Sequence, residues 1–348
     1  MFFGLSFTQK GVIMTKRYSI KDIARLSGVS VATVSRVINN NGRFSEETKN
    51  KVLKVIEDTG YQMNFSAKSL RMNKSFSVGI LVPDISNYFF ADTVQKIEEI
   101  LFEKGYSTII CNTSRNISKE NAYIKMLEGQ NIDGLIVISG ADEFGFDYLE
   151  PNKKIPYICI DREPKFKEHT IYISSNHYQG SFETTESLLN SGVKTPMILM
   201  HKRKSPSSIE RLNGFKDALK KNNIIFNHST NLLKVDYDTS DLEAQIENHF
   251  NKYPMIDGIF AINDEIGIKA LSTFDKLNLK VPEQIKIIGF DNIPSCDFTT
   301  PSLSSVNQDT TSIAENAVNS LLNLINEDAE TGETILIPVS LILRQSSK

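Results

Sequence analysis

From Phe76 onward, strand-length apolar runs alternate with segments long enough for helices, and this alternation limits the fold more than any other feature. The first apolar runs are VGILV, STIIC, GLIVIS and YICID, at residues 78–82, 107–111, 134–139 and 157–161. Segments long enough for helices, at 88–104 and 118–130, lie between the first three of them. Strands and helices that alternate at this spacing predict parallel sheets with helices on both faces.

The alternation starts again after TIYISSN, at residues 170–176. Three further strands are expected at 196–200, 258–263 and 285–290. The helices expected around them span 178–189, 209–220, 241–250 and 265–277. Two α/β units of similar size predict a two-lobed α/β body, with a ligand crevice between the lobes at the carboxyl ends of the strands.

Residues 18–61 precede this body and predict three short helices. Ser, Asp and Gly at the expected helix ends supply caps and stops. The caps are Ser19 with Asp22, Ser30 and Ser45, and the stops are Gly28 and Gly60. Two helices joined by a tight glycine turn and buried by a third form a helix-turn-helix unit.

The second of these helices has two unlike faces. At 100° per residue, its aliphatic side chains share one side, namely Val34, Val37 and Ile38. The opposite side carries Ala32, Arg36 and Asn39, flanked by Thr33 and Ser35. Arginine can donate to guanine O6 and N7, asparagine can pair with adenine, and hydroxyls can bind phosphates. The alternative is an ordinary amphipathic surface helix, but the caps and the glycine turn favour DNA binding.

The charge of the chain is unevenly divided. Residues 1–75 hold 13 Lys and Arg against 5 Asp and Glu, a charge of +8, whereas the whole chain has a net charge of −3. A basic head on an acidic body favours contact of the head with a polyanion over chance clustering. The three cysteines are far apart and no apolar run is long enough to span a membrane, so a cytoplasmic protein is expected.

Residues 18–71 resemble the headpiece of the LacI/GalR family of transcriptional regulators. The shared pattern is IxDIAxxxGVSxxTVSRVxN, then a helix that ends in GYxxN, then AxxL. The resemblance implies a recognition helix whose DNA-contacting residues are Ser30, Val31, Ala32, Thr33, Ser35, Arg36 and Asn39. Val31 and Ala32 occupy its variable specificity positions, and Arg36 resembles its base-contacting arginine.

The segment NFSAKSLRMNKS, residues 64–75, reads as a polar linker by itself. The resemblance implies a hinge helix that pairs with its copy in the DNA minor groove, through Asn64, Ala67, Leu70 and Arg71. Ala67 would lie at the helix–helix contact and Leu70 would wedge between base pairs. A helix this short is unstable alone, so a ligand that changes hinge spacing would control DNA affinity.

From Met14 on, the chain is similar to the same family throughout, which implies a periplasmic-binding-protein-like body. The expected divisions are a disordered tail at 1–15, a headpiece at 16–63 and a hinge at 64–75. The N-lobe is expected at 76–174 plus 307–333, and the C-lobe at 175–306 plus 334–348.

Polar and aromatic side chains that follow the predicted strands are the candidate effector ligands. They are Asn87, Phe89, Asp161, Arg162, Arg211, Asn263, Asp264, Asp291 and Gln308. Carboxylates, amides and arginine suit sugar hydroxyls, and aromatic rings stack on sugar faces. Tyr88, where the family has proline, and Ser175-Asn176-His177 depart from the family pattern.

These residues favour a sugar or sugar phosphate as effector, with ribose as one candidate. A purine or nucleoside and a phosphocarrier protein are the alternative effectors, and a sugar-modifying enzyme is a remote alternative function. No nucleotide-binding, hydrolase or metalloprotease motif is present, and His and Cys show no ligand spacing, so we expect neither an enzyme nor a metal or cofactor. Partners should be a second copy of the chain and a pseudo-palindromic DNA operator, with no membrane. The end of the chain at Lys348 without a heptad helix favours a dimer over a tetramer.

Overall fold

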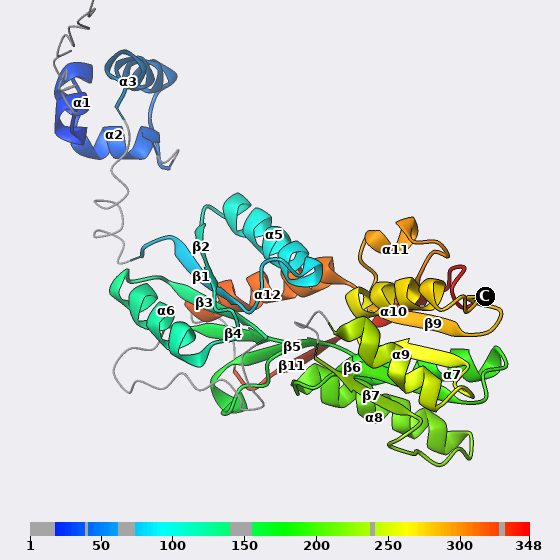
Figure 1. Cartoon of the computed structure of the whole chain (residues 1–348). Coiled ribbons are helices and arrows are strands. Elements are labelled where there is room, and N and C mark those ends of the chain that lie inside the picture. The colour runs from blue at the N-terminus through cyan, green and yellow to red at the C-terminus, as the bar shows by residue number, and fades with distance from the viewer. Residues whose placement is uncertain (1–17, 39–40, 62–73, 140–154, 237–240, 327–330) are drawn as a thin grey trace, which may run out of the picture. The chain divides into compact units, whose positions relative to one another are not determined.

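The computed structural model describes residues 18–38, 41–61, 74–139, 155–236, 241–326 and 331–348. They form two compact units, divided between residues 73 and 74 (Figure 1). The expected tail at 1–15 and most of the expected hinge lie outside the described residues, as do the candidates Asn39, Asn64, Ala67, Leu70 and Arg71. Among the described helices, none has the length and apolar character needed to cross a membrane.

The described residues of the first unit form three helices that begin and end where the local sequence predicts. They are α1 (Ile20–Ser27), α2 (Val31–Ile38) and α3 (Glu46–Thr59). Ser19 and Asp22 form a reciprocal capping box, and the Ser45 hydroxyl accepts a hydrogen bond from the Thr48 amide. Gly28 and Gly60 end α1 and α3 with φ of 65° and 60°, which is the left-handed region that favours glycine.

Five apolar side chains form the core of this small unit, and all three helices contribute to it. They are Ile23, Ala24, Val34, Val37 and Val52. Val34 and Val37 belong to the predicted aliphatic face of α2, which is therefore confirmed. The opposite face of α2 is left for solvent or a ligand.

In the second unit, the residues that the structure describes form two six-stranded sheets. The first has the order β11-β5-β4-β3-β1-β2, and all of its neighbouring strands are parallel. Its strands are β1 (Ser77–Val82), β2 (Ser107–Asn112), β3 (Gly134–Ile138), β4 (Tyr157–Ile160), β5 (Ile171–Ser175) and β11 (Thr334–Ile337). Its helices are α5 (Tyr88–Glu103), α6 (Ile117–Gly129) and α12 (Thr310–Ile325), and the short 3-10 helix η1 spans Lys167–His169. One apolar cluster packs α5 and α12 against the sheet, and a separate cluster packs α6 against it. Helices therefore cover both faces of the sheet, as predicted.

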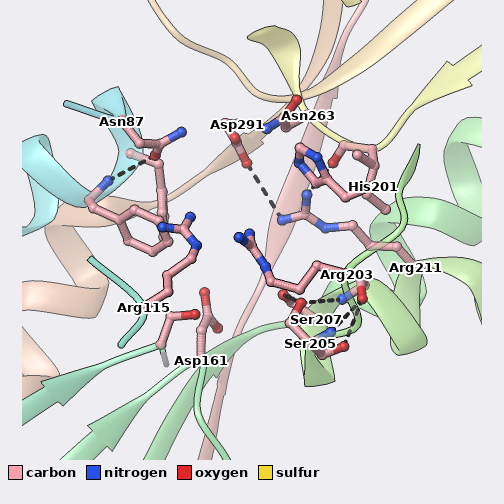
Figure 2. A pocket seen from close by; sticks show the side chains of 15 residues that line it. Asn87, Arg115, Asp161, His201, Arg203, Ser205, Ser207, Arg211, Asn263 and Asp291 are labelled. Carbon is pink, nitrogen blue, oxygen red and sulfur yellow. Dashed lines mark hydrogen bonds and ion pairs between the residues drawn. The ribbon is translucent and has the colours of Figure 1, made fainter. Parts of the chain in front are cut away.

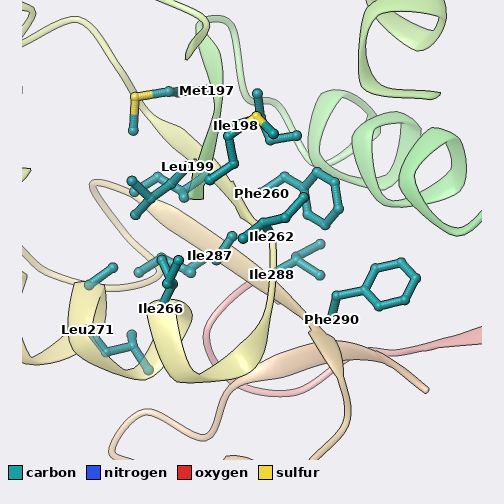
Figure 3. Packing of buried hydrophobic residues seen from close by; sticks show 14 of the residues in the cluster. Met197, Ile198, Leu199, Phe260, Ile262, Ile266, Leu271, Ile287, Ile288 and Phe290 are labelled. Atoms are coloured by element: carbon teal, nitrogen blue, oxygen red, sulfur yellow. The ribbon is translucent and has the colours of Figure 1, made fainter. Parts of the chain in front are cut away.

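The second sheet has the order β12-β10-β9-β8-β6-β7, in which β12 is antiparallel to β10. Its strands are β6 (Pro196–His201), β7 (Leu232–Val235), β8 (Gly258–Ala261), β9 (Lys286–Asp291), β10 (Ser304–Gln308) and β12 (Val339–Ile342). Its helices are α7 (His177–Asn190), α8 (Pro206–Lys221), α9 (Leu242–Lys252), α10 (Asp264–Lys276) and α11 (Ser295–Phe298). Figure 3 shows the aliphatic and phenylalanine side chains of β6, β8 and β9 that form its core.

The strand pairing moves two of the expected lobe boundaries. We expected the N-lobe to begin again at 307 and to end at 333. Instead, Asn307 and Gln308 pair with β9 or β12 in the second sheet. Residues 334–337 form β11, which pairs with β5 in the first sheet. The chain therefore returns to the second sheet only after Ile337, a side chain that is buried in the first core.

The packing of α7 against α8 depends on Gly214. A Cβ at this position would lie 2.3 Å from the carbonyl oxygen of Tyr178 and 3.0 Å from the amide nitrogen of Phe182. Because both are backbone atoms, a larger residue must push the helices apart. We expect Gly214→Ala to lower the free energy of unfolding by roughly 1–3 kcal/mol, measured by urea denaturation.

The control for this prediction is Gly129→Ala. Gly129 is the last residue of α6, and a Cβ there would meet no atom within 4 Å. It should leave stability unchanged or raise it by about 0.5 kcal/mol, because alanine loses less backbone entropy in a helix. Equal effects of the two substitutions would show that close packing at Gly214 does not matter.

Candidate functional site

The outer face of α2 has the composition expected of a DNA-reading surface. Ala32 and Arg36 are exposed, and Thr33 and Ser35 are partly exposed. Ser30 serves as the helix cap, because its hydroxyl accepts a hydrogen bond from the Thr33 amide at 3.1 Å. This cap gives α2 a defined start and a fixed rotation of its polar face.

Arg36 is supported by the loop that follows α2. The Asn41 amide donates to the Arg36 carbonyl at 3.0 Å, and a Cβ at Gly42 would lie 3.3 Å from Arg36 Cδ. The aliphatic part of Arg36 therefore lies against Gly42, which leaves the guanidinium exposed. An exposed guanidinium on a supported stem can form the paired hydrogen bonds that guanine offers in the major groove.

The second unit contains a cleft that residues of both lobes line. The first lobe supplies Asn87, Phe89, Phe90, Arg115, Ser139 and Asp161. The second lobe supplies His201, Arg203, Ser205, Ser207, Ser208, Arg211, Ile262, Asn263 and Asp291 (Figure 2). Most of them end or follow β1, β2, β3, β4, β6, β8 or β9, so the crevice lies at the carboxyl ends of the strands, as predicted.

Arg211 of α8 lies at the centre of the second-lobe wall and is 7% exposed. Its guanidinium donates to the Ile262 carbonyl and lies 3.5 Å from the centroid of the Phe290 ring. Nη2 also lies 3.5 Å from Asp291 Oδ1. Cation–π stacking, an ion pair and a backbone hydrogen bond together hold this buried cation in one position.

His177 connects Arg211 to Asp161. Arg211 Nη2 lies 3.2 Å from His177 Nδ1, and His177 Nε2 lies 2.9 Å from Asp161 Oδ1. Because Arg211 can only donate, Nδ1 accepts and Nε2 carries the proton that it donates to the carboxylate. In the sequence, His177 stands out only within the Ser175-Asn176-His177 departure from the family pattern. In the structure it begins α7 and joins these two cleft residues.

The two carboxylates of the cleft have opposite pKa shifts. Burial acts to raise the pKa of Asp161, but the His177 ring, the Ser174 hydroxyl and Arg211 outweigh it and hold this pKa below its ordinary value. Burial raises the pKa of Asp291, although Arg211 and the Gln308 amide act against that shift. Asp161 is therefore a hydrogen-bond acceptor, and in Asp291 the attraction of Arg211 works against the effect of burial.

Three lining residues have unusual backbone conformations. Ser139, Asp161 and Asp291 have φ of 40°, 51° and 111°, which lie in the region that non-glycine residues rarely adopt. Each lies at or just after the end of a strand, at the cleft. Strained backbone of this kind is concentrated at binding sites, where the surrounding structure holds it in place.

Six of the nine effector candidates line the cleft and three lie elsewhere. Arg162 points into the first lobe, where its Nη1 lies 2.6 Å from Glu120 Oε2. Asp264 is buried and accepts hydrogen bonds from the Ser305 hydroxyl at 2.6 Å and the Ile293 amide at 2.9 Å. Gln308 lies behind Asp291, to which its Nε2 donates at 2.7 Å. All three support the fold or a lining residue.

Sequence reasoning missed several polar residues of the cleft. They are Arg115, Ser139, His201, Arg203, Ser205, Ser207 and Ser208, together with Phe90 and Ile262. Most of the polar ones follow a predicted strand within a few residues, so the rule that selected Asp161 and Asn263 would have found them too. Within the described ranges, no group of His, Cys, Asp and Glu side chains is arranged to hold a metal ion.

Two family models match the chain. Residues 19–64 match the lacI family of bacterial regulatory proteins, and residues 185–347 match a periplasmic binding protein-like domain. The HTH-type transcriptional repressor PurR of Histophilus somni is 30% identical over 331 residues, which cover 95% of this chain and 99% of that protein. The ribose operon repressor of Halalkalibacterium halodurans is 29% identical over 330 residues, which cover 95% of this chain and 97% of that protein.

The fold also matches a solved structure. The crystal structure of the lac repressor dimer bound to operator and the anti-inducer ONPF aligns with a TM-score of 0.82, at 22% identity, over 95% of this chain and 99% of that one. The relatives are transcriptional repressors. The chain therefore belongs to the lacI family of bacterial regulatory proteins and is a DNA-binding transcriptional repressor rather than an enzyme.

Proposed function

We propose that this repressor senses a small polar molecule, a sugar or sugar phosphate, which binds in the cleft and releases the protein from its operator. The observation that carries the proposal is the set of hydrogen-bonding side chains that both lobes direct into one cleft (Figure 2). Asp161, Asn263 and Arg211 offer the acceptors and donors that sugar hydroxyls require. The name of the ribose operon repressor makes ribose a candidate.

Release follows from the two-lobed design. A ligand that contacts both lobes favours one relative position of them, and three chain crossings connect the lobes. We propose that this change reaches the expected hinge, residues 64–75, and thereby sets the operator affinity of a homodimer. A pseudo-palindromic operator would then pair one half-site with the α2 helix of each protomer.

A purine is the second candidate effector. Phe89 and Phe90 line the cleft with ring centroids 5.4 Å apart, and aromatic rings can stack on a planar base. The most similar proteins by sequence include several repressors named PurR, which favours this candidate.

A thermal-shift screen of the full chain separates these candidates. A ligand that binds only the native state stabilises it against unfolding, by about 2.7 kcal/mol at a ligand concentration of 100 Kd. The melting temperature therefore rises. The probes are ribose, ribose 5-phosphate, adenine and a phosphocarrier protein. A sugar or sugar phosphate should raise the melting temperature and weaken operator binding. A response to adenine alone would replace the sugar proposal, and a response to the phosphocarrier alone would place the sensing surface outside the cleft.

A further inference from the structure

Residues 74–77, the anchor segment, connect the end of the expected hinge to β1, and Asp133 holds them in place. Asp133 Oδ1 accepts hydrogen bonds from the Ser75 amide at 2.7 Å and the Ser75 hydroxyl at 3.1 Å. Its Oδ2 accepts from the Phe76 amide at 2.8 Å, and the Asp133 amide donates to the Ser77 carbonyl at 2.9 Å. A carboxylate that binds two successive backbone amides fixes the direction in which the chain enters β1.

The backbone of the anchor segment is strained at Phe76. Its φ of 53° lies in the left-handed region, which bulky residues rarely adopt. The Phe76 ring packs against Tyr106 with the ring centroids 5.8 Å apart, and the Phe76 carbonyl accepts a hydrogen bond from the Ser107 amide at 2.8 Å. Strain of this kind persists only where the surrounding contacts outweigh it. The first lobe therefore holds the anchor segment in one conformation.

A second contact joins the anchor segment to α12. Lys74 Nζ donates to Asn326 Oδ1 at 2.8 Å, and Asn326 caps the end of α12. The helix begins at Thr310, two residues after Gln308, whose amide donates to Asp291 in the cleft. The buried face of α12 packs in the core of the first lobe. With 16 residues, α12 is about 24 Å long, so one rigid element connects the cleft lining to the anchor segment.

The second lobe contains a similar carboxylate clamp at an equivalent place. Asp133 and Asp257 each follow Ile, precede Gly and stand immediately before a strand, β3 or β8, which pairs with the first strand of its lobe, β1 or β6. Asp257 Oδ1 accepts from the Thr195 amide at 2.7 Å, and Oδ2 accepts from the Lys194 amide at 2.9 Å. The Asp257 clamp holds the link between α7 and β6, whereas the Asp133 clamp holds the end of the expected hinge.

We infer that Asp133 is a positioning residue for operator binding, which acts through the anchor segment by fixing the point and direction from which the hinge leaves the body. This role rests on the hinge of the proposed function but requires no particular effector. In a homodimer, each protomer presents one hinge to the operator. A hinge that starts from a fixed segment loses less conformational freedom on binding than one that starts from a loose segment, so operator affinity is higher.

Operator titrations of the full chain, followed by fluorescence anisotropy, compare Asp133→Asn with Asp257→Asn. Asparagine keeps the size of aspartate but has only one acceptor oxygen, so in each variant one of the two clamped amides loses its partner. Both variants should therefore lose a similar amount of stability in urea. Only Asp133→Asn should weaken binding to an operator selected from a random DNA library, by about tenfold, because both protomers lose an anchor.

Ser75→Ala keeps the role of the anchor testable if Asp133→Asn does not fold. It removes the hydroxyl that donates to Asp133 and accepts from the Ser77 amide at 3.2 Å, but keeps both backbone bonds to Asp133. Operator binding should weaken by about threefold, at an unchanged melting temperature. Ser191→Ala is the matched control, because it removes a hydroxyl that donates to the Leu188 carbonyl at 2.8 Å in the second lobe, and it should leave operator affinity unchanged.

Equal operator affinities of the two folded aspartate variants would show that Asp133 only supports the fold and would contradict the inference. Wild-type operator affinity of Ser75→Ala would contradict it too. Ribose, ribose 5-phosphate or adenine, whichever raises the wild-type melting temperature, should raise that of Asp133→Asn equally, because Asp133 does not line the cleft. If none of these probes raises it or alters operator binding, the proposed effectors fail, but the two aspartate variants still decide the role of Asp133.

Discussion

Replacing Arg211 with methionine is expected to abolish effector binding and to destabilise the second unit. The substitution keeps an apolar side chain against Phe290 but removes the cation that lies 3.5 Å from Asp291 Oδ1 and that donates to the Ile262 carbonyl. It also removes the hydrogen-bond donor to His177 Nδ1. Because His177 in turn donates to Asp161, the position of Asp161 becomes less well fixed. A buried ion pair that loses one partner typically costs about 3–5 kcal/mol.

Two measurements check this prediction. Urea denaturation should show the loss of stability, and calorimetry with the ligand identified by the thermal-shift screen should show a loss of affinity of more than about 100-fold, about 2.7 kcal/mol. Lys276→Met is the control, because Lys276 is 61% exposed and pairs with Glu243 at the surface. An exposed ion pair of this kind contributes less than about 1 kcal/mol.

A double variant keeps the prediction testable if Arg211→Met alone does not fold. Without Arg211, the Asp291 carboxylate is buried and lacks its cation. Adding Asp291→Asn removes that charge and should restore part of the lost stability, because Gln308 can still donate a hydrogen bond to the new asparagine. Effector binding should not return. Wild-type affinity in either variant would show that Arg211 does not bind the effector.

Arg36→Ala is expected to weaken binding to the preferred operator by roughly 1–3 kcal/mol, which is about 5- to 150-fold, and to relax the preference at one base position. Arg36 is exposed on α2, and its stem is supported by Gly42, so the substitution should leave the headpiece folded. The measurement is selection from a random DNA library, followed by anisotropy titrations on sites that differ at one position.

Arg25→Ala provides the matched loss of charge. Arg25 lies in the last turn of α1 and is 71% exposed, with its Nη2 2.9 Å from Asp22 Oδ1. Any effect of this variant should be similar for all DNA sequences, because a general change in charge carries no sequence information. If Arg36→Ala also weakened all sequences equally, the base-reading role of Arg36 would be wrong.

Local signals were sufficient for the headpiece. The Ser19–Asp22 capping box and the left-handed turn at Gly28 involve residues three or fewer positions from the helix ends, so short-range chemistry determines them. The aliphatic face of α2 could also be predicted from its period, because only one side of a short helix can pack on its two neighbours.

The lobes depend more on contacts between distant parts of the chain. The strand β7 (Leu232–Val235) was not predicted, since it has four residues at a sheet edge and three of them are only partly buried. β11 and β12 are adjacent in sequence but belong to different sheets. The pairing of β11 with β5 and of β12 with β10 decides which sheet each strand joins. The apolar pattern of residues 334–342 does not reveal these long-range partners.

The cleft shows the same limit for individual side chains. Asp161 lines the cleft, as expected of a polar residue after a strand, but the adjacent Arg162 turns into the first lobe toward Glu120. Asn263 lines the cleft while Asp264 bonds Ser305. Neighbouring residues at a strand end point in different directions, and the tertiary partner decides which of them reaches the ligand.

The central claim is that a small molecule in the cleft controls operator binding, and one titration tests it most directly. The full chain is titrated onto a selected operator at constant salt, with and without a saturating concentration of the ligand that raises its melting temperature. We predict that the ligand weakens operator binding by at least tenfold for the wild-type protein and has no effect on Arg211→Met. An operator affinity that stays the same while the ligand occupies the cleft would contradict the account.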